Sequence, residues 1–142
     1  MLISEILRRK GSSVVTTGAG STVTELVGML SEHNIGALVV VDGDQVVGIV
    51  SERDVVRQLA EVGPAVLEQT VADLMSTELV SSSPQDLVDD IAAQMTDRRI
   101  RHLPVLSDGK LVGIVTIGDV VAARLHELER TRGQLESYIT GG

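Results

Sequence analysis

The stretch Gly48–Asp54, which reads GIVSERD, occurs a second time as Gly113–Asp119, which reads GIVTIGD. Both copies contain a glycine, two β-branched apolar residues, a hydroxyl residue and a carboxylate three residues after the hydroxyl. β-Branched residues favour strands, and a Ser or Thr followed three residues later by an acid is typical of a helix N-terminus. Each copy therefore predicts a strand that runs directly into the first turn of a helix.

The two copies lie 65 residues apart, and the same offset relates much of the chain. Residues 35–56 align with residues 100–121 without a gap, and ten of the 22 pairs are identical. Nearer the N-terminus, Ile3–Leu7 resembles Val71–Met75 at an offset of 68, so the first copy holds three extra residues within Arg8–Ser13. Such a repeat indicates two copies of one structural unit. We assign residues 1–65 to the first repeat, 66–127 to the second and 128–142 to a C-terminal helical extension.

Each repeat predicts the same order of elements. In the first, a short amphipathic turn at 3–7 and an extended segment at 14–17 precede a helix whose apolar residues recur at helical spacing over 23–30. A hairpin follows at 38–50, and its counterpart in the second repeat is 103–115. Because these strands are almost wholly apolar, helices are expected to cover both faces of their sheets.

Capping residues predict where this helix begins in each of the two repeats. Thr22, with Glu25 three residues later, marks the start of the helix in the first repeat. In the second repeat Ser83 is followed by Pro84, a pattern typical of a cap and a first-turn proline. The second helix is therefore expected to begin at this pair.

Composition limits the class of protein. The chain has no Cys, no Phe and no Trp and a single Tyr, so its core must be aliphatic and a bound ring cannot be stacked between aromatic side chains. The net charge of −8 lacks the basic footprint of a nucleic-acid-binding protein. No apolar run approaches the roughly 18 residues of a membrane span, and the N-terminus does not resemble a signal peptide. We therefore expect a cytoplasmic protein that binds neither nucleic acid nor membrane.

An apolar stripe runs along the C-terminal helix. Its members recur at alternating intervals of four and three residues, typical of a coiled coil, with one arginine among them: Val121, Leu125, Leu128, Arg132, Leu135 and Ile139. The stripe either packs onto its own domain or serves for self-association. Two heptads are too few to decide between these alternatives.

Two β-α-β-β-α units in tandem, each ending in Gly, two apolar residues, Ser or Thr, and then Asp three residues on, resemble the tandem CBS domain, or Bateman module. SERD at 51–54 followed by RRIRHLP at 98–104 is similar to small stand-alone bacterial CBS-pair proteins linked to signalling. The resemblance implies an α/β (α+β) fold in which two pseudo-twofold-related units pack sheet to sheet, with an extended C-terminal helix. It also implies a homodimer and two clefts that hold AMP, ADP, ATP, NAD(H) or S-adenosylmethionine.

The two hydroxyl and carboxylate pairs, Ser51 with Asp54 and Thr116 with Asp119, have two interpretations. One is a helix cap. The other is ligand contact, since a helix N-terminus offers free N–H groups, and a carboxylate held there can accept hydrogen bonds from both ribose hydroxyls. The family resemblance favours ligand contact, with Asp54 and Asp119 as ribose anchors.

Basic residues are the candidates for phosphate contact. Arg53 lies in a first helical turn, where the helix dipole prefers acids, so a phosphate partner explains it better than the helix does. The second copy has Gly118 there, so the two clefts should differ, and the first should tolerate more phosphate charge. By resemblance, Arg101 and His102 point into a cleft; solvated arginines and a charged helix end are the alternatives. Lys10 could also reach a phosphate, although a surface lysine is the simpler interpretation.

The remaining candidates come from the resemblance alone. It implies that Thr16 and Ser81 place a hydroxyl near the base, and that the backbone at two strand entries bonds the adenine edge. Those entries are Ala37, Leu38, His102 and Leu103.

No catalytic set is recognisable. The three histidines lack metal-ligand spacing, and no nucleophile, base and orienting group occur together in a known motif. We therefore expect a non-catalytic protein without a metal, which senses energy or redox state through an adenine nucleotide. The alternative is a CBS pair without a ligand that serves as a scaffold for dimerisation or for a protein partner.

Overall fold

The computed structural model describes residues 1–140, so the last two residues of the predicted C-terminal extension lie outside the described residues. The elements, in chain order, are α1 (Ile3–Lys10), β1 (Thr16–Thr17), α2 (Val23–His33), β2 (Ala37–Asp42), β3 (Gln45–Ser51), α3 (Glu52–Val62), the 3₁₀ helix η1 (Gly63–Glu68), α4 (Val71–Leu74), α5 (Val88–Arg98), β4 (His102–Ser107), β5 (Lys110–Thr116) and α6 (Ile117–Ile139). This order confirms the predicted α/β class and the twofold repetition of its elements.

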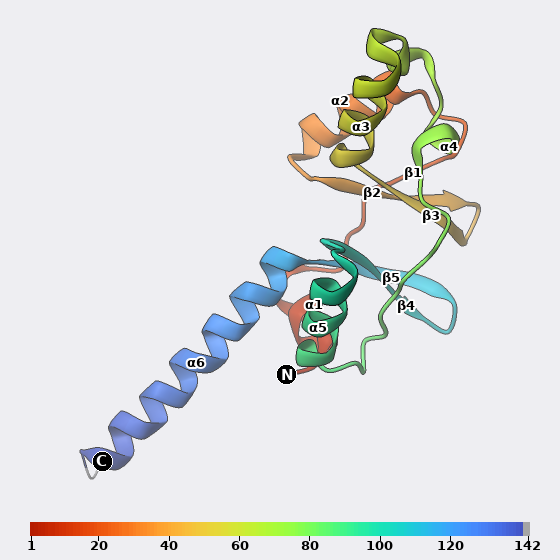
Figure 1. Cartoon of the computed structure of the whole chain (residues 1–142). Coiled ribbons are helices and arrows are strands. Elements are labelled where there is room, and N and C mark those ends of the chain that lie inside the picture. The colour runs from red at the N-terminus through yellow and green to blue at the C-terminus, as the bar shows by residue number, and fades with distance from the viewer. Residues whose placement is uncertain (141–142) are drawn as a thin grey trace.

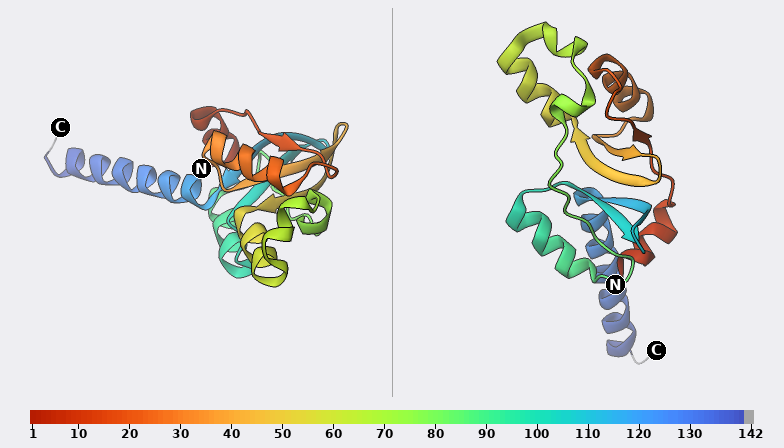
Figure 2. Two further views of the ribbon diagram at one scale, coloured as in Figure 1. Left: turned by 90° about the horizontal axis from the view of Figure 1, so that it is seen from above. Right: turned by 90° about the vertical axis from the view of Figure 1, so that its right-hand side faces the viewer.

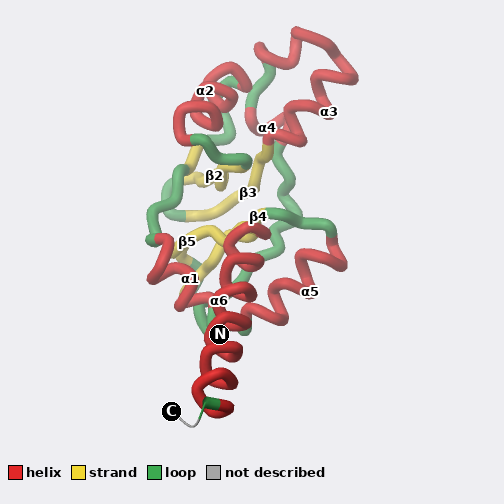
Figure 3. Tube along the Cα trace, turned by 90° about the vertical axis from the view of Figure 1, so that its left-hand side faces the viewer, coloured by secondary structure: helices red, strands yellow, loops and turns green. Residues whose placement is uncertain are grey.

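Two small sheets lie at the centre of the molecule, with helices outside them (Figures 1 and 3). One sheet has the order β1-β2-β3, with β1 parallel to β2, and the other consists of β4 and β5. In the second unit a single parallel bridge, Ser82 to Val105, stands where the first unit has β1. The expectation that helices cover both faces was wrong, because β3 and β5 of the two units are in contact and each sheet covers one face of the other (Figure 2).

The hairpins repeat in detail. Each has a register shift at the same place, between Val40 and Val41 and between Val105 and Leu106. Both turns have two residues, and both use positive φ angles, as at Gly43 with φ 60. Such turns match the twist of the flanking strands. The offset of 65 therefore holds at the level of backbone irregularities.

Helices α2 and α5, which occupy equivalent places in the two repeats, have different N-termini. The predicted cap of α2 is confirmed, since the Glu25 N–H donates to Thr22 Oγ1 at 3.1 Å. The prediction for α5 was wrong, because the helix begins at Val88. Ser83 instead opens a turn, and its N–H donates to Asp86 Oδ2 at 2.9 Å. The Pro84 carbonyl accepts from the Ser4 N–H at 2.9 Å, which holds this turn against the N-terminus of the chain.

The N-terminal helix of each repeat packs on the other unit's hairpin. Leu7 of α1 is buried in the core of the second unit, whereas Val71 of α4 is buried in the core of the first. The glycines of the repeated motif make this approach possible. A Cβ at Gly48 would lie 2.9 Å from the Ser76 carbonyl oxygen, and a Cβ at Gly113 would lie 2.6 Å from Leu7 Cδ2. The exchange therefore explains why both copies of the motif begin with glycine.

Helix α6 starts on its own unit and then projects away from the body (Figure 1). Its buried residues are Val120 and Ala123. The apolar stripe lies on another face: Leu128 is 62% exposed and Ile139 is 80% exposed. The interpretation that the stripe packs onto its own domain was therefore wrong, and self-association stays a prediction. In the part of the chain that the structure describes, neither α6 nor any other helix has the length and apolar character needed to span a membrane.

Candidate functional site

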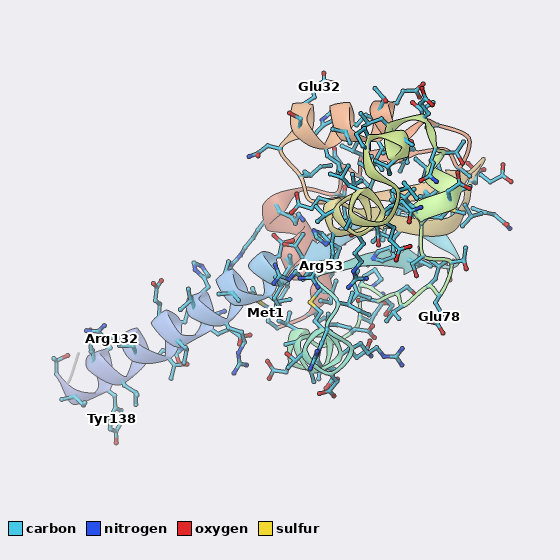
Figure 4. The ribbon with its side chains drawn as sticks, turned by 45° about the horizontal axis from the view of Figure 1, so that its top comes forward. Met1, Glu32, Arg53, Glu78, Arg132 and Tyr138 are labelled. Carbon is cyan, nitrogen blue, oxygen red and sulfur yellow. The ribbon has the colours of Figure 1, made fainter. Side chains whose placement is uncertain are left out.

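A cavity of about 530 Å³ lies where the N-terminal half of α3 faces the strand entries of both units. We call it the α3 cavity. Its lining comes from the entries to β2 and β4, from the end of β3, from α3 and from the segment before Ser81: Gly36, Ala37, Ile49, Ser51, Glu52, Arg53, Asp54, Val56, Arg57, Ser76, Glu78, Val80, Arg99, Ile100, Arg101 and His102. Figure 4 shows Arg53 where the two units meet.

Six of the candidate residues line this cavity together: Ala37, Ser51, Arg53, Asp54, Arg101 and His102. Sequence reasoning missed two of its arginines. Arg57 lies one turn after Arg53 on α3, so an i, i+4 pair of arginines was the available signal. Arg99 ends α5 with φ 54, a left-handed conformation that is uncommon for arginine, and a sequence pattern does not reveal it.

Ser51 and Asp54 form a reciprocal cap at the start of α3. The Asp54 N–H donates to Ser51 Oγ at 3.4 Å, and the Ser51 N–H donates to Asp54 Oδ2 at 2.8 Å. The Ser51 hydroxyl also lies 3.0 Å from Oδ2. The capping interpretation is thus confirmed, and it uses one carboxylate oxygen. Among residues 1–140, no group donates to the other oxygen, Asp54 Oδ1, so it remains able to accept hydrogen bonds, and Asp54 lines the cavity.

The cavity collects cationic side chains in a chain whose net charge is −8. Its lining holds four arginines against three acids: Arg53, Arg57, Arg99 and Arg101 against Glu52, Asp54 and Glu78. Within residues 1–140, no ion pair engages any of the four guanidinium groups. Guanidinium groups that are free of carboxylate partners are well suited to a phosphate, which they can bind through two parallel hydrogen bonds.

His102 lines the cavity together with these arginines. Burial lowers its pKa below the ordinary value of an imidazole; nearby Arg101 and Lys10 lower it further, and Glu52 and Asp119 act in the opposite direction. A Cβ at Gly36 would lie 3.2 Å from His102 Nε2, so the absence of a side chain there leaves room for the ring. The lowered pKa favours the neutral imidazole at neutral pH. The burial that lowers the pKa and the space left at Gly36 thus set the charge and the position of the ring.

The corresponding residues at the start of α6 have a different partner. Thr116 and Asp119 form the same reciprocal cap, with the Thr116 N–H donating to Asp119 Oδ2 at 2.9 Å and the Asp119 N–H to Thr116 Oγ1 at 3.1 Å. Lys10 Nζ lies 2.7 Å from the same Oδ2 and donates to the Ile114 carbonyl at 2.9 Å. Lys10 does not line the α3 cavity; it pairs with Asp119.

The other candidates lie outside the α3 cavity. The side chains of Leu38 and Leu103 are fully buried, so only their backbone atoms are available to a ligand. Thr16 pairs with Val39 in the first sheet. Ser81 is exposed, next to the buried Ser82. Among the described residues, no group of three His, Cys, Asp or Glu side chains could hold a metal ion.

Comparison with known proteins identifies both repeats. The CBS domain family matches residues 3–61 and 71–126. The chain is 38% identical over 149 aligned residues to the mitochondrial CBS domain-containing protein CBSX3 of Arabidopsis thaliana, covering 99% of this chain and 72% of that protein. The crystal structure of the CBS-domain protein ATU1752 from Agrobacterium tumefaciens superposes with a TM-score of 0.85 at 42% identity, over 87% of this chain and 99% of the other.

A further structure carries ligands. The CBS domain pair of protein MJ0100, solved in complex with 5′-methylthioadenosine and S-adenosyl-L-methionine, superposes with a TM-score of 0.77 at 28% identity. The superposition covers 89% of this chain and 99% of the other. The two family matches and the structure of a CBS domain pair thus agree with the tandem organisation that the 65-residue offset predicts.

Proposed function

Since this chain belongs to the CBS-domain family and carries two copies of the domain, we propose that it binds an adenine nucleotide in the α3 cavity and acts as a non-catalytic energy or redox sensor. The candidate ligands are AMP, ADP, ATP and NAD(H). The observation that carries the proposal is the shared lining: Asp54 and four arginines face one cavity of about 530 Å³. That volume lies within the range of about 300 to 1,000 Å³ typical of small-molecule sites.

Each part of a nucleotide has a chemical counterpart in the cavity. Asp54 Oδ1 accepts from ribose hydroxyls, while Oδ2 keeps the helix cap. At the start of α3 the N–H groups of Glu52 and Asp54 are engaged, by the Gly36 carbonyl and by Ser51 Oγ. The Arg53 N–H and the guanidinium groups of Arg53 and Arg101 are the donors that attract phosphate oxygens. The base lies on aliphatic surface, which Ile49 and Val80 supply. The two adenosine-containing ligands of the MJ0100 complex support a compound of this class.

The sensing role requires that bound nucleotide change the contact between the units. The lining of the α3 cavity comes from both units, with Asp54 from the first and Arg101 from the second. A ligand that bridges them favours one relative packing over another, and a partner protein that reads this packing would respond to nucleotide concentration. We place this function in a homodimer in the cytoplasm.

A scaffold without a ligand is the second candidate, and a specific observation favours it. Helix α3 has no fully buried residue; Val55 packs against the core of the first unit, and three other apolar side chains are exposed, Val56 by 63%, Leu59 by 46% and Val62 by 43%. An apolar helix face of this kind is typical of a surface that another protein covers. A scaffold needs this face and does not need Asp54.

Calorimetric titration of the full chain with AMP, ADP, ATP, NAD⁺, NADH and S-adenosylmethionine, with GTP as comparison, tests the proposal. We expect binding of at least one adenosine compound and its loss in Asp54→Asn. The matched control is Asp73→Asn, because the Asp73 carboxylate caps α4 as Asp54 caps α3, with the Thr70 N–H donating to Oδ2 at 3.0 Å, but does not line the cavity. Binding equal in Asp54→Asn and the parent chain, or no binding of any adenosine compound to nucleotide-free protein, would favour the scaffold.

A further inference from the structure

The repeat makes it possible to compare the α3 cavity residue by residue with its counterpart at the N-terminus of α6, which we call the α6 position. The 65-residue offset carries Ser51 and Asp54 onto Thr116 and Asp119, so the cap is preserved. The four arginines of the α3 cavity have no cationic counterparts: their equivalents are Gly118, Ala122, Asn34 and Gly36. The α6 position therefore keeps the carboxylate and has no arginine at the four equivalent places.

Lys10 is the cation found at the α6 position, and its charge is already engaged. Its ammonium group donates to Asp119 Oδ2 at 2.7 Å and to the Ile114 carbonyl at 2.9 Å. The side chains of Lys10 and Asp119 are only 29% and 21% exposed, so solvent screens the pair incompletely. Lys10 lies within residues 8–13, the segment in which the first repeat holds three extra residues. The α3 cavity has no lysine in its lining.

We propose that Lys10 keeps the α6 position closed to phosphorylated adenosine compounds, so that each chain binds one such molecule, in the α3 cavity. The inference rests on the proposed function and adds its stoichiometry. A nucleotide that enters the α6 position must displace a charge-assisted hydrogen bond from Asp119 before its ribose can take that carboxylate. Its phosphates then meet a single ammonium group in place of four arginines. Loss of one charge-assisted bond corresponds to about 10-fold or more in affinity.

Calorimetric titration of the full chain with AMP, ADP and ATP tests this stoichiometry. For the parent chain we expect one nucleotide per chain and none in Asp54→Asn. Lys10→Met keeps the apolar stem and removes the ammonium group, so a second molecule per chain should bind, with affinity at least about 10-fold tighter than any residual binding at the α6 position of the parent chain. The second site should disappear in Lys10→Met/Asp119→Asn. Arg9→Met, an exposed change on the same helix, should leave one molecule per chain.

The outcomes separate this inference from the proposed function. Two nucleotides bound to the parent chain, or a single one bound to folded Lys10→Met, would overturn the inference and leave nucleotide binding in the α3 cavity intact. Weaker total binding in Lys10→Met would also overturn it, because Lys10 would then be a phosphate ligand. If the parent chain binds none of the three nucleotides, the proposed function fails, and the stoichiometry of one fails with it. Lys10→Met/Asp54→Asn then decides whether Lys10 closes the α6 position, which one bound molecule per chain supports and none overturns.

Discussion

Alanine in place of Gly48 should destabilise the fold more than alanine in place of Gly113. A Cβ at Gly48 would meet the Ser76 carbonyl oxygen and Met75 Sδ, each at 2.9 Å. Ser76 cannot retreat easily, because it exchanges two backbone hydrogen bonds with Ile49, at 2.9 and 3.0 Å. A Cβ at Gly113 meets the end of the Leu7 side chain, at 2.6 Å, and that side chain can change its rotamer.

Overpacking of this kind costs about 1 to 3 kcal/mol, and we expect Gly48→Ala in the upper half of that range and Gly113→Ala in the lower half. For a chain of this size, the larger loss corresponds to a fall in melting temperature of roughly 6 to 12 °C. Urea unfolding followed by far-ultraviolet circular dichroism measures the free energy of unfolding of each variant.

Gly28→Ala is the matched control, because Gly28 lies inside α2 and a Cβ there meets no atom within 4 Å. Alanine is the better helix former, so this variant should gain about 0.5 to 1 kcal/mol. If Gly48→Ala proved as stable as the parent chain, the packing of Met75 and Ser76 on β3 would not be as described. If Gly113→Ala lost more than Gly48→Ala, the distinction between a fixed carbonyl and a movable side chain would be refuted.

Three further predictions concern the site and the long helix. Because the pKa of His102 is lowered in the folded state, chiefly by burial, the unfolded chain binds an extra proton as the pH falls below about 6.5, so urea midpoints should fall from pH 7 to 5.5, and less so in His102→Gln. Arg99→Asn should raise the free energy of unfolding by about 0.5 to 1 kcal/mol, since Asn tolerates the left-handed conformation that Asn34 adopts at the equivalent place, while calorimetry shows weaker nucleotide binding. Leu128→Asp/Leu135→Asp should convert a dimer into a monomer by light scattering, because charges enter the exposed stripe.

Each of these predictions has a result that would contradict it, and two have a control variant. For the pH dependence, exposed His33→Gln is the control, and equal slopes in His102→Gln and the parent chain would contradict the burial of the ring. For the left-handed position at Arg99, a loss of stability in Arg99→Asn would show that contacts of the arginine side chain offset its backbone strain. For the helix, Arg130→Asp adds the same charge outside the stripe, and an unchanged mass in the stripe variant would assign any dimer to another surface.

Sequence patterns predicted those features of the fold that repeat locally. The strands, the hairpins and the caps at Ser51 and Thr116 all follow from residues close together in the chain, and the 65-residue offset counts each of them twice. The start of α5 was mispredicted because Ser83 bonds Asp86 in a turn that the N-terminus of the chain holds in place. A pattern of residues within one segment does not reveal such a distant partner.

The arrangement of the units and part of the site depend on contacts between residues that are far apart in the chain. The exchange of α1 and α4 between the cores leaves no local signature other than the glycines that receive them. The pair between Lys10 and Asp119 joins residues 109 positions apart. Arg99 lines the α3 cavity and itself has a left-handed backbone conformation. The sequence thus predicted Asp54 and Arg53 as candidates, and the structure places both in one cavity, whereas the full set of arginines that line it required coordinates.

NMR titration of the isotope-labelled full chain with AMP and ATP tests nucleotide binding in the α3 cavity most directly. We predict that the amide signals that shift most belong to Ser51–Asp54 and Arg99–His102, the two segments that meet in the α3 cavity. Saturating shifts confined to other surfaces, or no shift at millimolar nucleotide, would contradict it.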